Sequence, residues 1–105
     1  TPPVWRPVPL AEDIEGDRGL LPVQAAQRVG ERVAQEMGFE LVETVFQKEP
    51  RGKCLCYFVD LAAGMTLSDC ERFHRAVQPL LEQVEYDFLE VSSPGVDRPI
   101  KTLRD

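Results

Sequence analysis

Three cysteines and the single histidine are the residues of this sequence that could hold a metal or carry thiol chemistry. Cys54 and Cys56 are two apart, so both point to one side of a strand, whereas Cys70 and His74 are four apart on one side of a helix. Together they would make a three-cysteine, one-histidine zinc site. Structural zinc ligands usually stand on tight turns, however, and a buried cysteine is by default a small hydrophobe. We therefore interpret the four residues as core, with a metal or thiol-redox site as the alternative.

Nothing else in the sequence is typical of an enzyme. The pair of Cys70 and His74 has no orienting carboxylate or oxyanion hole that can be read from the sequence. The chain also lacks a phosphate-binding glycine loop, a metalloprotease motif and a nucleophile elbow. We therefore expect neither catalysis nor a cofactor, a resident metal or a small-molecule substrate.

Size, charge and cysteine usage limit the class of protein. A chain of 105 residues with 43% hydrophobic residues is one small domain. No apolar run approaches the roughly 20 residues that span a bilayer, so we expect no membrane. With no recognisable signal sequence and an odd number of cysteines, a cytoplasmic location is the simplest expectation. The net charge of -6 argues against bulk binding of polyanions.

The spacing of apolar residues predicts five elements after a proline- and acid-rich extended arm over 1–20. The first helix begins at Pro22 and ends before Gly38. A second helix starts after Thr66, which caps it with Asp69 three residues on, and Pro79 ends or kinks it. The predicted strands cover 39–48, 53–61 and 86–92, and the first two form an antiparallel hairpin.

This order predicts an α+β fold: an αββαβ two-layer sandwich over 21–94, with a three-stranded sheet and both helices on one face. A crossover through the second helix should return the last strand to a place beside the first. The other face of the sheet would then be open. The same order occurs in single-stranded RNA-binding KH domains, but the Gly-x-x-Gly loop that they require is absent here.

The segment that follows the last strand is unusually stiff. Ser93-Pro94-Gly95-Val96 is typical of a type II turn, with positive φ at glycine, and Pro99 keeps Arg98 extended. We expect 95–105 to be a rigid linker without further secondary structure. Its basic side chains, on an acidic domain, should have few internal partners and so be available to a binding partner. The candidate partner-binding residues, for the ribosome or for a neighbouring domain, are Ser92, Ser93, Pro94, Gly95, Asp97, Arg98, Pro99 and Lys101. A purely structural role remains open for Asp97, which could pair with Arg98 or with a backbone amide.

Three stretches carry a family resemblance: GFELVETVF, VDLAAGMTLSDCERFHRAVQPLLE and LEVSSPGVDRPIKTLRD. Over about 22–105 they resemble the amino-terminal domain of the RimP ribosome maturation factor family. The resemblance implies a non-enzymatic assembly factor that binds a small ribosomal subunit intermediate, through ribosomal protein and ribosomal RNA, late in assembly. It also implies an SH3-like carboxy-terminal domain, absent here, toward which the linker would lead. Cys54, Cys56, Pro79 and the length of the arm depart from the family pattern.

Overall fold

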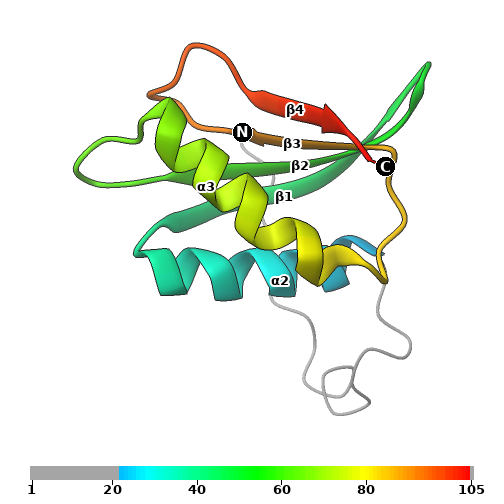
Figure 1. Cartoon of the computed structure of the whole chain (residues 1–105), viewed down its shortest axis with the longest axis horizontal. Coiled ribbons are helices and arrows are strands. Elements are labelled where there is room, and N and C mark those ends of the chain that lie inside the picture. The colour runs from blue at the N-terminus through cyan, green and yellow to red at the C-terminus, as the bar shows by residue number, and fades with distance from the viewer. Residues whose placement is uncertain (1–21, 105) are drawn as a thin grey trace.

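The computed structural model describes residues 22–104, so the predicted arm over 1–20 lies outside the described residues. Figure 1 shows two helices crossing the same face of one sheet. The predicted α+β class with two layers is therefore confirmed. The elements are α2 (Pro22–Met37), β1 (Glu40–Glu49), β2 (Gly52–Asp60), α3 (Leu67–Val77), the 3-10 helix η1 (Gln78–Leu81), β3 (Phe88–Ser92) and β4 (Ile100–Leu103). Between Pro22 and Arg104, neither helix has the length and apolar character needed to cross a bilayer.

The sheet has four strands, and the prediction of three was wrong. Part of the segment expected to be a linker folds back as β4, which pairs antiparallel with β3. Ile100 pairs with the buried Val91 and packs against the core, and Thr102 Oγ1 lies 2.8 Å from Nε2 of His74 on α3. With four residues and a single apolar residue facing the helices, β4 has too weak a pattern to be detected in the sequence.

The strand order is β1-β2-β3-β4, so β3 lies beside β2 and not, as predicted, beside β1. The two strands are parallel, with Leu55 opposite Leu89 and Tyr57 opposite Val91. β2 is buried along most of its length, whereas the one buried residue of β1 is Thr44 and its other residues are exposed or partly buried. A strand that is apolar on both faces belongs in the middle of a sheet, which explains why β2 has a neighbour on each side.

The core lies between the helices and the inward-facing side chains of the sheet. The Tyr57 ring contacts Phe73 of α3 edge-on, with centroids 5.5 Å apart and an interplanar angle of 75°. Its hydroxyl donates to the carbonyl of Ala26 on α2. One residue therefore joins the central strand to both helices. The other buried hydrophobic residues of this cluster are Val33, Ala34, Leu55, Val59, Met65, Cys70, Val77, Leu81, Val84, Tyr86, Leu89 and Val91.

The helix ends follow the sequence signals. Gly38 adopts a φ of 77° after the last residue of α2, a conformation that glycine accepts without strain. Thr66 and Asp69 form the complete capping box of α3, in which each side chain accepts from the other's backbone N–H. Pro79 stands in η1, directly after the end of α3. The predicted cap and the predicted helix end at proline are confirmed.

Arg104 fixes the end of β4 to the connection before β3. Its guanidinium donates to the carbonyls of Val84 and of Glu82, the latter at 3.2 Å. It also lies 4.3 Å from the ring centroid of Tyr86, a cation–π contact. The backbone N–H of Arg104 donates to the carbonyl of Asp87 at 2.8 Å. The end of the four-residue strand is therefore held by side-chain contacts of Arg104 as well as by backbone hydrogen bonds.

Gly30 lets α2 approach Tyr57, and we expect Gly30→Ala to destabilise the domain. A Cβ at this position would lie 2.9 Å from Cδ1 of Tyr57, closer still to its Cε1, and 3.2 Å from a methyl carbon of Leu41. Overpacking typically costs about 1–3 kcal/mol, which exceeds the gain of roughly 1 kcal/mol in helix propensity. Urea unfolding should show a lower free energy of unfolding. The control is Gln35→Ala, at an exposed position of the same helix, and equal stability of the two variants would contradict the packing account.

Candidate partner-binding surface

Residues 93–99, here called the signature loop, connect β3 to β4. Val96 N–H donates to the carbonyl of Ser93 at 3.1 Å, so the predicted turn exists. Gly95 does not have a positive φ, however, and the assignment to type II was wrong. Proline at the second position with non-positive φ at the third fits a type I turn. The glycine is therefore not required by the backbone conformation of the turn.

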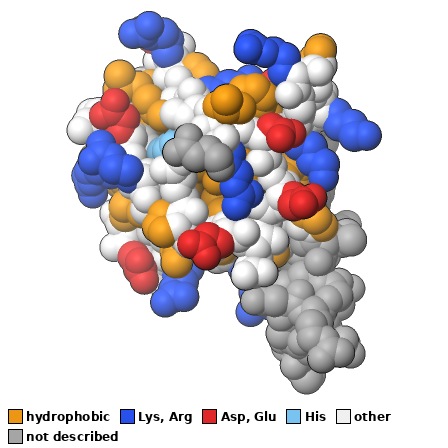
Figure 2. Space-filling model, turned by 45° about the vertical axis from the view of Figure 1, so that its right-hand side comes forward, with side chains coloured by type: hydrophobic (Ala, Val, Ile, Leu, Met, Phe, Trp, Pro, Cys, Tyr) orange, Lys and Arg blue, Asp and Glu red, His pale blue; other side chains and the backbone are white. Residues whose placement is uncertain are grey.

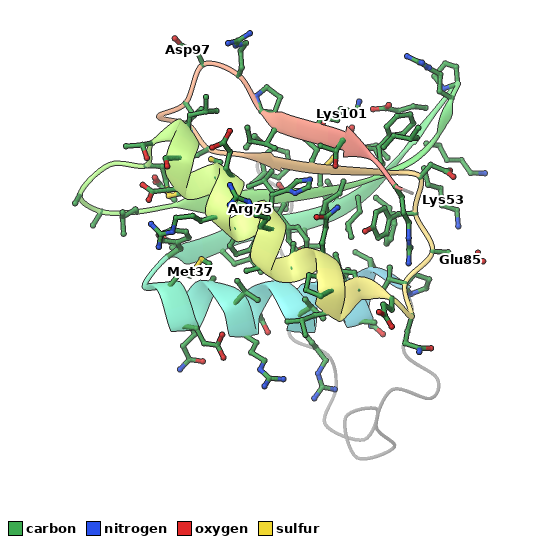
Figure 3. All side chains as sticks on the ribbon, in the orientation of Figure 1. Met37, Lys53, Arg75, Glu85, Asp97 and Lys101 are labelled. Carbon is green, nitrogen blue, oxygen red and sulfur yellow. The ribbon has the colours of Figure 1, made fainter. Side chains whose placement is uncertain are left out.

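The outer part of the loop is exposed at Asp97, Arg98 and Pro99. Figure 3 shows Asp97 at the outer bend, projecting away from the helices. Within the part of the chain that the structure describes, neither Asp97 nor Arg98 makes a side-chain hydrogen bond or an ion pair. The interpretation that Asp97 pairs with Arg98 or a backbone amide therefore has no contact to support it. Both charged groups are presented to solvent.

A surface hollow of about 310 Å³ lies between the signature loop and the start of α3. Leu67, which is 41% exposed, and Val96 provide apolar surface there. The hollow is also lined by Thr66, Gly95, Asp97 and Arg98. Sequence reasoning missed the contribution of Thr66 and Leu67, because only the folded chain brings α3 next to the loop.

The start of α3 is not available to an anion. The Asp69 carboxylate accepts from the backbone N–H of Thr66 at 3.0 Å. Hydrogen bonds from the backbone and side chain of Thr66 hold the pKa of Asp69 below its usual value. A negative charge already occupies the place at which a helix N-terminus attracts anions. The end of the hollow next to α3 therefore suits an apolar or basic group of a partner. Arg98 provides the positive charge at the other side of the hollow.

The two serines of the candidate set are less accessible than expected. Ser92 is half-buried at the end of β3, where it pairs with Phe58 of β2. Because side chains alternate along a strand and Val91 faces the helices, Ser92 lies on the opposite face. Ser93 is 6% exposed, and its Oγ has no hydrogen-bond partner among the described residues. Neither hydroxyl is presented at the loop surface in the way that Arg98 is.

Lys101 is engaged within the domain, so the expectation that it has few internal partners was wrong. Its ammonium donates to both carboxylate oxygens of Glu49, at 3.0 and 3.2 Å, and lies 4.0 Å from Glu90. It also stands 5.4 Å from the ring centroid of Phe88. The hydrogen bonds with Glu49 raise the pKa of Lys101. Figure 3 shows Lys101 on β4 and Asp97 on the loop, well apart.

On the face of the described residues that Figure 2 shows, no single basic area dominates. On the face shown in Figure 2, the Lys and Arg side chains alternate with Asp and Glu side chains and with hydrophobic patches. The net charge of the whole sequence is -6. Any contact with nucleic acid would therefore have to be local, because non-specific binding to phosphates requires a continuous basic face.

The four residues of the alternative metal site are not brought together. Cys70 and His74 lie on α3, on the helix side of the sheet, whereas Cys54 and Cys56 face the opposite side of β2. Burial raises the pKa of the Cys70 thiol, as expected of a core cysteine. The structure instead places Glu90 beside Cys54 and Cys56. Sequence reasoning missed Glu90, because the pairing of β2 with β3 could not be known from the pattern of either strand.

His74 should make the stability of the domain depend on pH. Burial lowers its pKa below the usual 6.5, Arg75 lowers it further, and a hydrogen bond with the backbone of Leu89 opposes the shift. The unfolded chain therefore binds more protons than the native one as the pH falls below 6.5. We expect the free energy of unfolding to fall over that range, as measured by urea titration at several pH values. In His74→Gln this part of the pH dependence should disappear, whatever the stability of that variant at neutral pH.

An unchanged slope in His74→Gln would contradict the assignment to His74. The contribution of Asp69 falls in a separate range, because its pKa is depressed and its stabilising effect is lost only as the pH falls through that lower value. The two groups can therefore be distinguished by the pH at which stability is lost.

One comparison with known proteins bears on this surface. The family model described as the RimP N-terminal domain matches residues 29–97, which is more than half of the chain. The match runs from α2 into the signature loop. It includes the candidate residues from Ser92 to Asp97, and it ends before Arg98, Pro99 and Lys101.

Proposed function

Because the chain belongs to the RimP N-terminal domain family, a family of ribosome maturation factors, we propose that it binds an assembly intermediate of the small ribosomal subunit. The proposed action is binding without catalysis, in the cytoplasm. The family match is the observation that carries the proposal. The geometry of the signature loop supports it by offering a surface on which such a partner could be held.

Arg98 is the side chain we propose as the main contact. It is exposed on a segment bounded by Pro94 and Pro99. These prolines limit the backbone conformations of the free loop, so less conformational entropy is lost on binding. An arginine presented in this way can pair with a phosphate of ribosomal RNA or with an acidic group of a ribosomal protein. The hollow next to it, with Leu67 and Val96, would accept an apolar group of the same partner.

Binding of this kind can promote assembly without chemistry. A factor that binds one conformation of an intermediate better than the alternatives raises the population of that conformation. The shift is limited by the difference in affinity between the states. We propose that the domain leaves when the maturing subunit no longer offers the surface that fits the signature loop.

β4 suggests how a second domain would be oriented. We propose that the SH3-like domain implied by the resemblance follows β4 and contacts part of the same candidate surface. The contacts of Arg104 with Val84 and Tyr86 would then fix the direction in which the chain leaves the sheet. In this arrangement the 95–105 segment connects the domains through a strand and not through an extended linker alone.

Co-sedimentation with purified small ribosomal subunits tests the proposal. We expect saturable binding that weakens as salt is raised, since charged contacts are screened. Arg98→Glu should weaken binding by about 10-fold or more, because one charge-assisted contact is commonly worth 1.5–3 kcal/mol. The fraction bound would be measured over a range of protein concentrations at two salt concentrations.

Arg51→Glu is the matched control, because it makes the same charge change at an exposed residue in the β1–β2 turn. Equal losses in the two variants would indicate a general charge effect and would contradict a specific contact at Arg98. No binding by the domain, together with binding by a version that includes a following domain, would move the main contact outside the signature loop.

A further inference from the structure

A second group of side chains gathers on the face of the sheet opposite the helices. Cys54 and Cys56 of β2 are fully buried there, with their Sγ atoms 3.5 Å apart. Glu90 of β3 places Oε1 3.8 Å from Cys54 Sγ. On the other side, Gln47 of β1 places its Oε1 3.8 Å from Cys56 Sγ. Three neighbouring strands therefore direct two sulfurs and two oxygens toward one place.

The sheet register explains why these residues meet. Cys56 is opposite Glu90 in the parallel pair, and Cys54 is opposite Gln47 in the antiparallel pair. Paired residues carry their side chains on the same face of a sheet. The arrangement is therefore set by backbone pairing and does not depend on a flexible loop.

We propose that Cys54, Cys56 and Glu90 bind a Zn²⁺ ion, with the Gln47 amide oxygen or a water as the fourth ligand. The three side chains place ligand atoms within 4.8 Å of one another. Thiolate sulfur and carboxylate oxygen are usual zinc ligands, four of which surround the ion as a tetrahedron. This site shares two cysteines with the pattern considered from the sequence, but Glu90 replaces the residues on α3.

Two of the three spacings between ligand atoms are close to those of tetrahedral zinc. Bonds of about 2.3 Å to sulfur and about 2.0 Å to oxygen, at a tetrahedral angle, separate two sulfurs by roughly 3.8 Å and a sulfur from an oxygen by roughly 3.5 Å. The distances here, 3.5 Å between the sulfurs and 3.8 Å from Cys54 Sγ to Glu90, differ from these by only a few tenths of an ångström. A linear two-sulfur site, as a monovalent soft cation prefers, would require the sulfurs to move apart.

Binding would offset most of the negative charge of the site. Two thiolates and the Glu90 carboxylate carry three negative charges, and the ion supplies two positive ones. The ammonium of Lys101, 4.0 Å from Glu90, offsets part of the remaining negative charge, which it shares with its closer partner Glu49. Both thiols must lose their protons to the solvent, since only thiolate binds the ion. Because binding releases these protons, it should strengthen as the pH is raised.

Zinc titration of the chain tests the proposal. The protein would be reduced with a phosphine, freed of metal with a chelator and desalted, and ZnCl₂ would be added against a chromophoric competitor. We expect one equivalent to bind. Cys54→Ser and Cys56→Ser should each weaken zinc binding more than 100-fold. Glu90→Gln should weaken it about 10–100-fold, since removal of a group that only hydrogen-bonds to a ligand already lowers metal affinity by such a factor.

Cys70→Ser is the matched control, because it removes a buried thiol from the helix side of the sheet and should leave the affinity for zinc unchanged. Cd²⁺ gives a second measure that separates folding from ligation. Its ultraviolet thiolate charge-transfer band should correspond to two thiolates in the unmodified chain and in Glu90→Gln. Each of the variants Cys54→Ser and Cys56→Ser should retain the intensity of one thiolate or less.

The proposal is wrong if the reduced, metal-free chain binds no stoichiometric zinc. It is also wrong if zinc binds but the affinity is lost in Cys70→Ser and retained in Cys54→Ser and Cys56→Ser. Far-ultraviolet circular dichroism of each variant shows whether it is folded. Glu90→Gln keeps both thiols and the shape of the side chain, so it still decides the role of the carboxylate where a cysteine variant unfolds.

Discussion

Tyr57 is the residue at which β2 meets both helices, and the arrangement of the domain depends on that contact. Its ring stands edge-on to Phe73 of α3, passes next to the backbone of Gly30 on α2, and its hydroxyl donates to the carbonyl of Ala26. A buried hydroxyl without a partner would cost free energy, so the hydrogen bond fixes where α2 lies. The helices then cover one face of the sheet and leave the other for different side chains.

The two faces of β2 consequently have separate roles. On the helix side, Leu55, Tyr57 and Val59 form the core with the helices and β3. On the opposite side, Cys54 and Cys56 stand next to Glu90, and Lys101 of β4 bridges Glu49 and Glu90. The same alternation of side chains therefore produces a packed core on one face and a polar cluster with buried thiols on the other.

β4 gives the basic residues of the two proposed sites different surroundings. By pairing with β3 it turns the preceding segment into a closed loop, which presents Arg98 to solvent beside the start of α3. The next basic residue, Lys101, is held on the outer face of the sheet by carboxylates. Two basic side chains three positions apart thus have different environments. Arg98 is exposed to solvent, whereas Lys101 is held by Glu49 and Glu90.

Local signals in the sequence were sufficient for the helices, the hairpin and the helix ends. Pro22, Gly38, Thr66 with Asp69, and Pro79 act on the backbone within a few residues, so their effects can be read directly from the chain. The apolar run over 53–61 likewise predicted a strand, which the structure places at β2. The arrangement of motifs that resembles the RimP family needed no coordinates either, since it is a property of the residues themselves.

Only the tertiary structure decided the features that depend on pairing between distant strands. The short β4 has one inward apolar residue, Ile100, and becomes a strand because β3 offers an edge and His74 a partner for Thr102. The place of β3 beside β2 brought Glu90 to the two cysteines and left Cys70 on the other side of the sheet. Periodicity tells which residues share a face of one strand, but not which strand lies beside it, because that choice is made by burial over the whole domain.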